Sequence, residues 1–297
     1  MLTEPSVSEA LPQTASLNPR LYLIGRPTFD VEEFISFLTA SGQSWESSKE
    51  ATDSEKLVEV AGRVCYMSFG PHQRTKPNSA YIANLLRQGH ESVLEHVSWT
   101  FLLEGVSRAF THQFVRHRVG FAFSQLSQQY HEESDAAFVE PAAIKALPEL
   151  SKLWRDTVER CRETYNHIVT TLGKSNLLER SIAETREVLR ALRAAARSVL
   201  PNATETKIVF SANARAIRHF LTVRGGVVGD EEMRVVSHLI LERVRIEAPA
   251  LFQDFISELQ ADGLPLVYPL GSPSSDGGSR NVGSRNDVTA SDESLTR

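Results

Sequence analysis

Cysteine is scarce in this sequence, and its scarcity excludes several kinds of site. The 297 residues include two cysteines, Cys65 and Cys161, which lie far apart in the chain. One such pair provides neither a disulfide scaffold nor a four-cysteine metal site. Cys65 falls in an apolar helical pattern over 54–66. Cys161 lies in the apolar stripe of a second pattern over 150–172, so we expect both thiols in the core rather than as nucleophiles.

Long apolar runs and an excess of positive charge are also absent. Apolar residues make up 41% of the sequence, yet no run of them approaches the roughly 18 residues that span a membrane. Lys and Arg total 32 against 37 Asp and Glu, and the net charge of -5 disfavours a surface built for nucleic acid. No charged-then-apolar leader is found. We therefore expect a cytoplasmic protein without a membrane or nucleic-acid partner.

Three common chemical motifs are missing as well. The zinc motif H-E-x-x-H needs a histidine four residues after the first, but Leu94 occupies that position after His90 and Glu91. Neither the dinucleotide fingerprint G-x-G-x-x-G nor the phosphate-binding loop G-x-x-x-x-G-K-[ST] occurs. We expect no metal site, no Rossmann fingerprint and no P-loop.

Helical periodicity dominates what is present, and strand patterns are few. Apolar spacing predicts helices over 54–66, 80–88, 106–118, 150–172, 181–200 and 231–244, and another after residue 213. Strand patterns cover 21–25, 97–105 and 207–213. Because strands and helices do not alternate regularly, we expect an α+β fold, with helices packed on a small mixed or antiparallel sheet.

Polar segments flank this region. Ser, Thr, Pro and Glu are frequent before residue 20, and the residues after about 270 are nearly free of apolar side chains. Such composition cannot bury a core. We expect one domain over 20–262, between a disordered extension, 1–19, and a disordered tail, 263–297.

Two clusters of cationic side chains interrupt the acidic composition. The first, within 106–130, places Arg116, His117 and Arg118 among phenylalanines and short polar side chains. The second runs from Asn213 to Arg224. A solvated helix face would explain either cluster alone. Together, beside apolar residues, they favour either a ligand with several phosphates or one phosphate plus a cofactor, because the planar guanidinium binds phosphate in a bidentate manner.

At this point the sequence resembles the flavin-dependent thymidylate synthases. The family signature, R-H-R followed after seven residues by Ser, is similar to Arg116–Arg118 and the S-Q-L-S-Q-x-Y stretch at 124–130. G-H-E-S-x-x-E-H at 89–96 and G-V-S-R-A-x-x-H-Q at 105–113 precede it in the family order. L-P-N-A-T-E-T at 200–206, N-A-R at 213–215 and E-x-R at 232–234 follow. The resemblance covers roughly residues 20–257.

The resemblance implies a reaction, its cofactors and an assembly. Methylenetetrahydrofolate gives its one-carbon unit to C5 of dUMP, and FAD, reduced by NADPH, supplies the hydride that completes dTMP. The family works without a covalent cysteine and activates the pyrimidine with a nearby cation, which stabilises the charge that develops on the ring. Members are usually homotetramers that share active sites between subunits.

Site residues follow from the same resemblance. Arg224 corresponds to the activating cation and, with Ser127, is assigned a catalytic role. The residues implied at the nucleotide are Gln113, Gln125, Ser127, Gln129, Lys207 and Arg224. Those implied at FAD are His90, Ser92, Glu95, Arg116, His117, Arg118, Asn213, Arg215 and His219.

The sequence departs from the family pattern on the nucleotide side. Eight residues, 119–126, separate Arg118 from Ser127 where the family has seven, and Gly120 can absorb the insertion as a bulge. Gln129 and Lys207 stand where the family has arginines, and Val228 where many members have histidine. Two alternatives therefore stay open: a divergent flavoenzyme that modifies another pyrimidine nucleotide, and a homologue that binds nucleotide or flavin without turnover.

Overall fold

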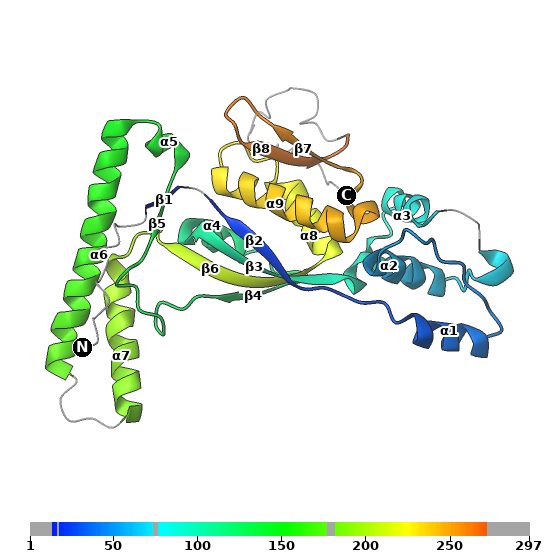
Figure 1. The fold of residues 1–297 in the computed structure, drawn as a ribbon, viewed down its shortest axis with the longest axis horizontal. Coiled ribbons are helices and arrows are strands. Elements are labelled where there is room, and N and C mark those ends of the chain that lie inside the picture. The colour runs from blue at the N-terminus through cyan, green and yellow to red at the C-terminus, as the bar shows by residue number, and fades with distance from the viewer. Residues whose placement is uncertain (1–13, 17, 74–76, 177–181, 272–297) are drawn as a thin grey trace, which may run out of the picture.

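A four-stranded antiparallel sheet forms the centre of the computed structural model (Figure 1). The structure describes residues 14–16, 18–73, 77–176 and 182–271. The strands, in spatial order, are β2 (Arg20–Gly25), β3 (Ser98–Ser107), β6 (Glu205–Asn213) and β4 (Phe121–Gln125). The central pair aligns Phe101 with Phe210, so strands distant in sequence meet along their length.

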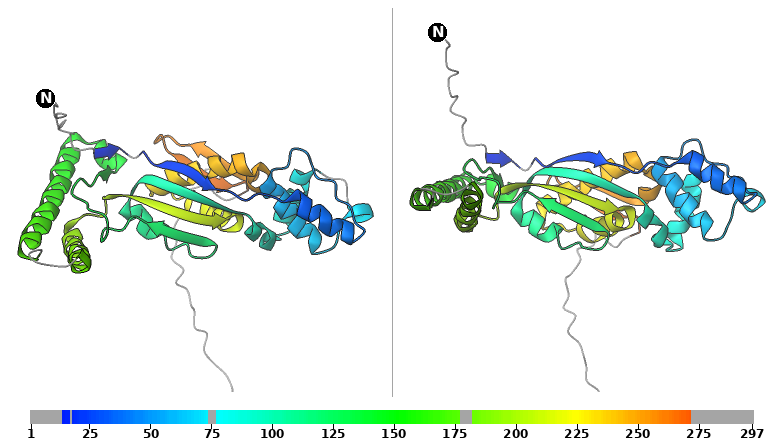
Figure 2. Two further views of the ribbon diagram at one scale, coloured as in Figure 1. Left: turned by 60° about the horizontal axis from the view of Figure 1, so that its bottom comes forward. Right: turned by 90° about the horizontal axis from the view of Figure 1, so that it is seen from below.

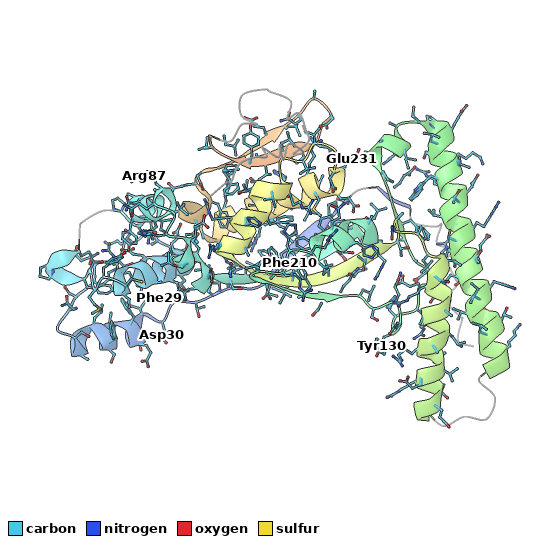
Figure 3. All side chains as sticks on the ribbon, turned by 180° about the vertical axis from the view of Figure 1, so that it is seen from behind. Phe29, Asp30, Arg87, Tyr130, Phe210 and Glu231 are labelled. Carbon is cyan, nitrogen blue, oxygen red and sulfur yellow. The ribbon has the colours of Figure 1, made fainter. Side chains whose placement is uncertain are left out.

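One face of the sheet is buried and the other is partly open. Side chains alternate along β3, where Trp99, Phe101 and Leu103 are buried and their neighbours are not. Helices cover the buried face (Figure 2). They are α4 (Arg108–Phe114), α8 (Ala214–Arg224) and α9 (Glu231–Glu247). Phe114 on α4 packs edge-on against Phe210, with ring centroids 5.0 Å apart, which places Phe210 at the centre of the core (Figure 3).

Each covering helix begins at a residue whose side chain caps it. Ser107, Asn213 and Asp230 accept backbone N–H bonds from residues three positions later, at 3.0, 2.8 and 3.2 Å. Such caps satisfy amide groups left without partners in the first turn. A hairpin of β7 (Phe255–Leu259) and β8 (Pro265–Pro269) packs on the outer side of α9, after the short helix η4 (Pro249–Phe252).

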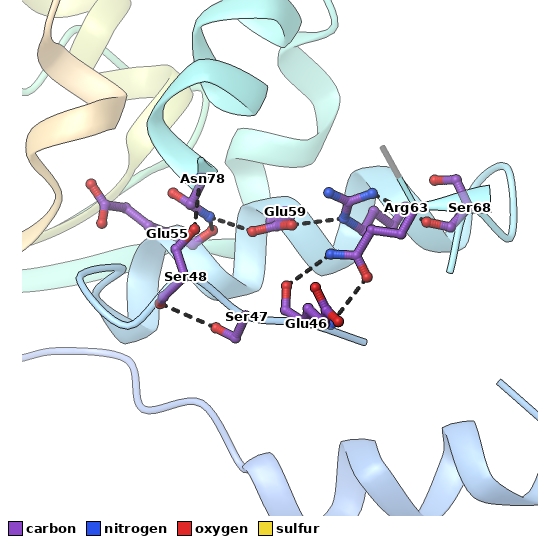
Figure 4. A network of polar contacts seen from close by, with 9 residues as sticks. Glu46, Ser47, Ser48, Glu55, Glu59, Arg63, Ser68 and Asn78 are labelled. Atoms are coloured by element: carbon purple, nitrogen blue, oxygen red, sulfur yellow. Dashed lines mark hydrogen bonds and ion pairs between the residues drawn. The ribbon is translucent and has the colours of Figure 1, made fainter. Parts of the chain in front are cut away.

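Three helices lie at one end of the long axis: α1 (Val31–Ala40), α2 (Asp53–Val64) and α3 (Asn78–Arg87). The short helices η1 (Gly70–His72) and η2 (Glu91–His96) belong to the same half of the chain. A buried polar network joins α2 to α3, in which Glu59 lies between Asn78 and Arg63 and accepts a 2.7 Å bond from each (Figure 4). Glu55 accepts the backbone N–H of Ala250 at 2.7 Å, which ties α2 to η4.

A helical hairpin lies at the opposite end of the molecule (Figure 1). It consists of α6 (Pro148–Asn176) and α7 (Ile182–Ala196), followed by η3 (Arg197–Val199). The short α5 (Ala142–Lys145) precedes it, and β1 (Thr14–Ser16) pairs in parallel with β5 (Phe138–Glu140) nearby. Among the described residues, no helix is long and apolar enough to cross a membrane.

The structure confirms the α+β fold and corrects several boundaries. The helix predicted over 106–118 is shorter, because β3 continues to Ser107 and α4 ends at Phe114. The expected domain limits, 20 and 262, are too narrow. β1 precedes the first, and β8 follows the second and buries Val267 completely. The remainder of the expected extension and tail, 1–13, 17 and 272–297, lies outside the described residues.

The expectation that both cysteines are buried in the core is wrong. Cys65 is exposed at the C-terminal end of α2, where its thiol donates to the carbonyl of Ala61 at 3.3 Å. Cys161 is half-buried because α6 packs mainly against α7, and a two-helix contact covers only part of an apolar stripe. The apolar periodicity correctly predicted these two helices, but it overestimated how completely other elements bury their apolar faces.

Candidate active site

A pocket of about 540 Å³ opens beside the first turn of α8. Four of the residues implied at FAD line it, namely Glu95, Asn213, Arg215 and His219. A second pocket of about 350 Å³ adjoins it and is lined by His90 and Ser92. Both pockets are lined by Glu91 and Arg215, so they lie side by side, and we call them together the α8 groove.

The end of β6 positions the cations of the α8 groove. Asn213 is the last residue of the strand and the cap of α8, so Arg215 and His219 follow at helical positions on one side of the helix. Arg215 forms ion pairs with Glu95 at 2.5 Å and Glu91 at 3.3 Å. Its hydrogen bond with Glu95 raises the pKa of the guanidinium, which stays charged.

A tight turn at Val119 and Gly120 forms the opposite wall. Gly120 has a φ of 72°, and an added Cβ would lie 2.7 Å from the Cβ of Ala216 and 2.8 Å from the Asn213 amide. Only glycine suits both the backbone and this contact. β4 pairs with β6 in regular register from Phe121 to Gln125.

Arg224, at the end of α8, reaches two residues of the signature segment. Its Nε donates to Nε2 of His117 at 3.1 Å, and an Nη lies 3.5 Å from the side-chain oxygen of Gln113. Burial, then the charges of Arg224 and His219, lowers the pKa of His117, so the imidazole is neutral near pH 7 and can accept this bond.

The other residues implied at the nucleotide lie at the end of β4, in the turn after it and on β6. Gln125 donates to the hydroxyls of Thr111 and Thr206, at 3.0 and 3.3 Å. Ser127 accepts the backbone N–H of Gln129 at 3.3 Å in the turn after β4. Lys207 is exposed and lies 3.6 Å from Glu205.

The predicted site residues thus form three groups rather than one. The groups are the α8 groove, the cluster of Gln113, His117 and Arg224, and the Gln125–Ser127 segment with Lys207. Arg116 and Arg118 are exposed outside them. Among the described residues, no group of three or more His, Cys, Asp or Glu side chains is placed to hold a metal ion.

Sequence reasoning missed two threonines that orient Gln125. Thr111 and Thr206 are completely buried yet carry hydroxyls. The sequence could have indicated the burial of Thr206. It lies two and four residues before Ile208 and Phe210, so it shares their face of the strand. Ser92 and Glu95 have the three-residue spacing of a capping box, but the cap position of η2 is His90, which makes no side-chain bond there. Glu95 pairs with Arg215 instead.

Comparisons with known proteins identify the family of the chain. Residues 49–250 match the family model described as thymidylate synthase complementing protein. A flavin-dependent thymidylate synthase of Corynebacterium diphtheriae is 42% identical over 229 residues, which cover 77% of this chain and 89% of the relative. One from Mycobacterium leprae is 41% identical over 230 residues, covering 76% and 89%. The chain belongs to the flavin-dependent thymidylate synthase family.

Proposed function

We propose that this enzyme methylates dUMP reductively to dTMP, with methylenetetrahydrofolate as carbon donor, NADPH as reductant and FAD in the α8 groove. The observation that carries the proposal is the cluster at Arg224, a guanidinium whose Nε donates to the neutral imidazole of His117, at the end of the helix whose first turns line the groove. A fixed cation there is suited to stabilise negative charge on a pyrimidine ring stacked beside a flavin.

The residues of the α8 groove suit FAD. Its two adjoining pockets, of about 540 and 350 Å³, have volumes in the range of small-molecule and cofactor sites. Arg215, His219 and His90 offer donors for the pyrophosphate, and the missing side chain of Gly120 leaves its backbone accessible from the groove. Asn213, Ser92 and Glu95 supply polar contacts. Bound FAD supplies the hydride, and Arg116, His117 and Arg118 would approach it from the signature segment.

Arg224 acts on the nucleotide in this proposal. Its Nε is occupied by His117, which leaves part of the guanidinium fork directed at a pyrimidine carbonyl. Gln113 lies beside it to bind the base. Gln125 is oriented by its two threonines, and Ser127, Gln129 and Lys207 extend the surface on which the rest of the nucleotide is bound. The Ser127 hydroxyl is the second catalytic group we assign.

We infer that the enzyme assembles as a homotetramer. In it, residue groups from different subunits meet to form each complete active site. The uncovered face of the sheet supports assembly, since Tyr22 and Ile24 are 41% and 57% exposed on it. Arg116 and Arg118, also exposed, are cations free to face a ligand held by another subunit.

Turnover of dUMP tests the proposal. Purified protein with FAD, NADPH and methylenetetrahydrofolate should release dTMP. Arg224→Ala should lower kcat/KM by about 100-fold or more, as expected when a preorganised donor is removed. Arg87→Ala, an exposed arginine on α3, is the matched control and should retain activity. A flavin-loaded protein that releases no dTMP would contradict the proposal. Turnover of a different pyrimidine nucleotide in its place would show that dUMP is not the substrate.

A further inference from the structure

Arg234 on α9 is a completely buried arginine that touches none of the proposed site residues. Its side chain is 1% exposed, and all of its N–H groups have acceptors. Two bonds, of 2.5 and 3.0 Å, form a fork with the carboxylate of Asp262 in the β7–β8 loop. The others reach the carbonyls of Leu264, Pro265 and Val228. Such complete satisfaction is what a buried guanidinium requires.

The acceptors belong to two segments that meet beside Arg224. Val228 lies in the turn 225–230, which starts at the residue after Arg224. The carbonyl of Arg224 accepts the N–H of Val227 at 3.2 Å, so the turn folds back on the end of α8. Leu264 and Pro265 lead into β8, where the N–H of Val267 donates to the carbonyl of Gly225 at 3.0 Å.

Gly225 shows how closely β8 approaches. A Cβ on Gly225 would lie 2.5 Å from the carbonyl oxygen of Val267, a distance that real side chains do not adopt. β8 therefore forms a wall against the backbone that carries Arg224. Arg234 joins both sides, because it binds the turn through Val228 and the hairpin through Leu264 and Pro265.

We propose that Arg234, paired with Asp262, is a positioning residue for the reaction: it locks turn 225–230 against the β7–β8 hairpin and so fixes the direction of the Arg224 guanidinium. The inference rests on the role proposed for Arg224. Lysine cannot replace Arg234, since a single ammonium cannot bridge the carboxylate fork and three carbonyls. Small displacements of a catalytic group are costly, about 100-fold in rate for a shift of about 1 Å.

Asp262→Asn is the test variant, because Asp262 is 47% exposed on a surface loop and its replacement spares the buried arginine. We expect kcat/KM for dUMP to fall about tenfold, with kcat carrying most of the loss and FAD content unchanged. Arg234→Lys should give the same pattern, and Asp262→Glu should restore part of the rate. Arg155→Met, which removes the 2.9 Å ion pair with Glu140 near the α6–α7 hairpin, should leave the rate unchanged.

A double-mutant cycle separates positioning from general destabilisation. If Asp262 acts through Arg224, Asp262→Asn should have no further effect on kcat in an Arg224→Ala background. An equal fold-loss in both backgrounds, or wild-type kcat/KM for Asp262→Asn, would overturn the inference. Wild-type activity of Arg224→Ala alone would instead show that the role proposed for Arg224 is wrong.

Discussion

His117 gives the Arg224 cluster a dependence on pH. Its pKa is lowered below the ordinary value of about 6.5, chiefly by burial and then by Arg224 and His219. The neutral form accepts the Arg224 bond, and the imidazolium, which forms as pH falls from about 6.5 through the lowered pKa, cannot. Stability that depends on the neutral form is lost over the same acidic window.

We therefore expect the affinity for dUMP to weaken on acidification. The dissociation constant should rise between about pH 7.5 and about pH 5, and His117→Gln, whose amide oxygen accepts at any pH, should remove most of this rise. The phosphate of dUMP also titrates near pH 6, and the variant carries the same phosphate, so the difference between the two proteins isolates His117. If the dissociation constants of the two proteins changed equally with pH, protonation of His117 would have no effect on dUMP binding.

Gln129 offers a gain of function by a single substitution. It stands where the family pattern has an arginine, half-buried in the turn after Ser127. Gln129→Arg should tighten dUMP binding about tenfold or more, since a charged hydrogen bond to phosphate contributes about 1.5 to 3 kcal/mol. Titration of the flavin absorbance with dUMP measures this. Unchanged affinity would mean that the turn directs position 129 away from the phosphate.

Residue identities in motif order predicted the candidate site residues, and six of those implied at FAD line the two pockets of the α8 groove. One residue of each cationic cluster meets the other, since Nε of Arg224 donates to Nε2 of His117 at 3.1 Å, whereas Arg116 and Arg118 are exposed. What the sequence could not show was the division into three groups or the exposure of Cys65. Both depend on which surfaces cover a residue, and covering surfaces come from segments far away in the chain.

At the scale of elements, two charged residues of α9 anchor the ends of helices that carry candidate site residues. Glu232 accepts the backbone N–H of Ser107 at 2.7 Å and its hydroxyl at 2.5 Å, which anchors the start of α4. Arg234 anchors the turn after α8. Three of the four strands of the central sheet and most of the longer helices were predictable from periodicity, but α1, α5, β1, β4, β5, β7 and β8 were not. β4 and β8 are short strands, where five residues show too little pattern.

Glu232→Gln should change how stability depends on pH. Burial raises the pKa of Glu232 despite the bonds from Ser107, so the folded protein binds a proton more readily than the unfolded chain. Stability then falls as pH rises from about 4.5 through the raised pKa. The glutamine does not titrate, so the variant should gain in melting temperature relative to wild type on going from about pH 4.5 to about pH 7. A pH-independent difference would contradict this.

At the scale of the whole molecule, the open face of the sheet carries a prediction about assembly. Ile24 is exposed on that face, and burial of its side chain between subunits would contribute about 1.5 to 3 kcal/mol. Ile24→Glu should lower the native mass below that of four chains and reduce dTMP formation with it. Ile246→Glu, on α9 and 69% exposed, is the matched control. Light scattering measures both, and an unchanged mass for Ile24→Glu would place the interface elsewhere.

The bond between Glu55 and Ala250 bears on how the chain folds as it is synthesised. Its partners are 195 residues apart, and the carboxylate of Glu55 is buried. Likewise, the central strand pair of the sheet cannot form until β6 has been synthesised, because β3 pairs with it. The helices α6 and α7, in contrast, are consecutive in the chain. On the ribosome the helical hairpin can therefore form early, while the N-terminal helices remain incomplete until η4 emerges. Nascent chains that stop before residue 250 should accordingly be sensitive to proteases around α2.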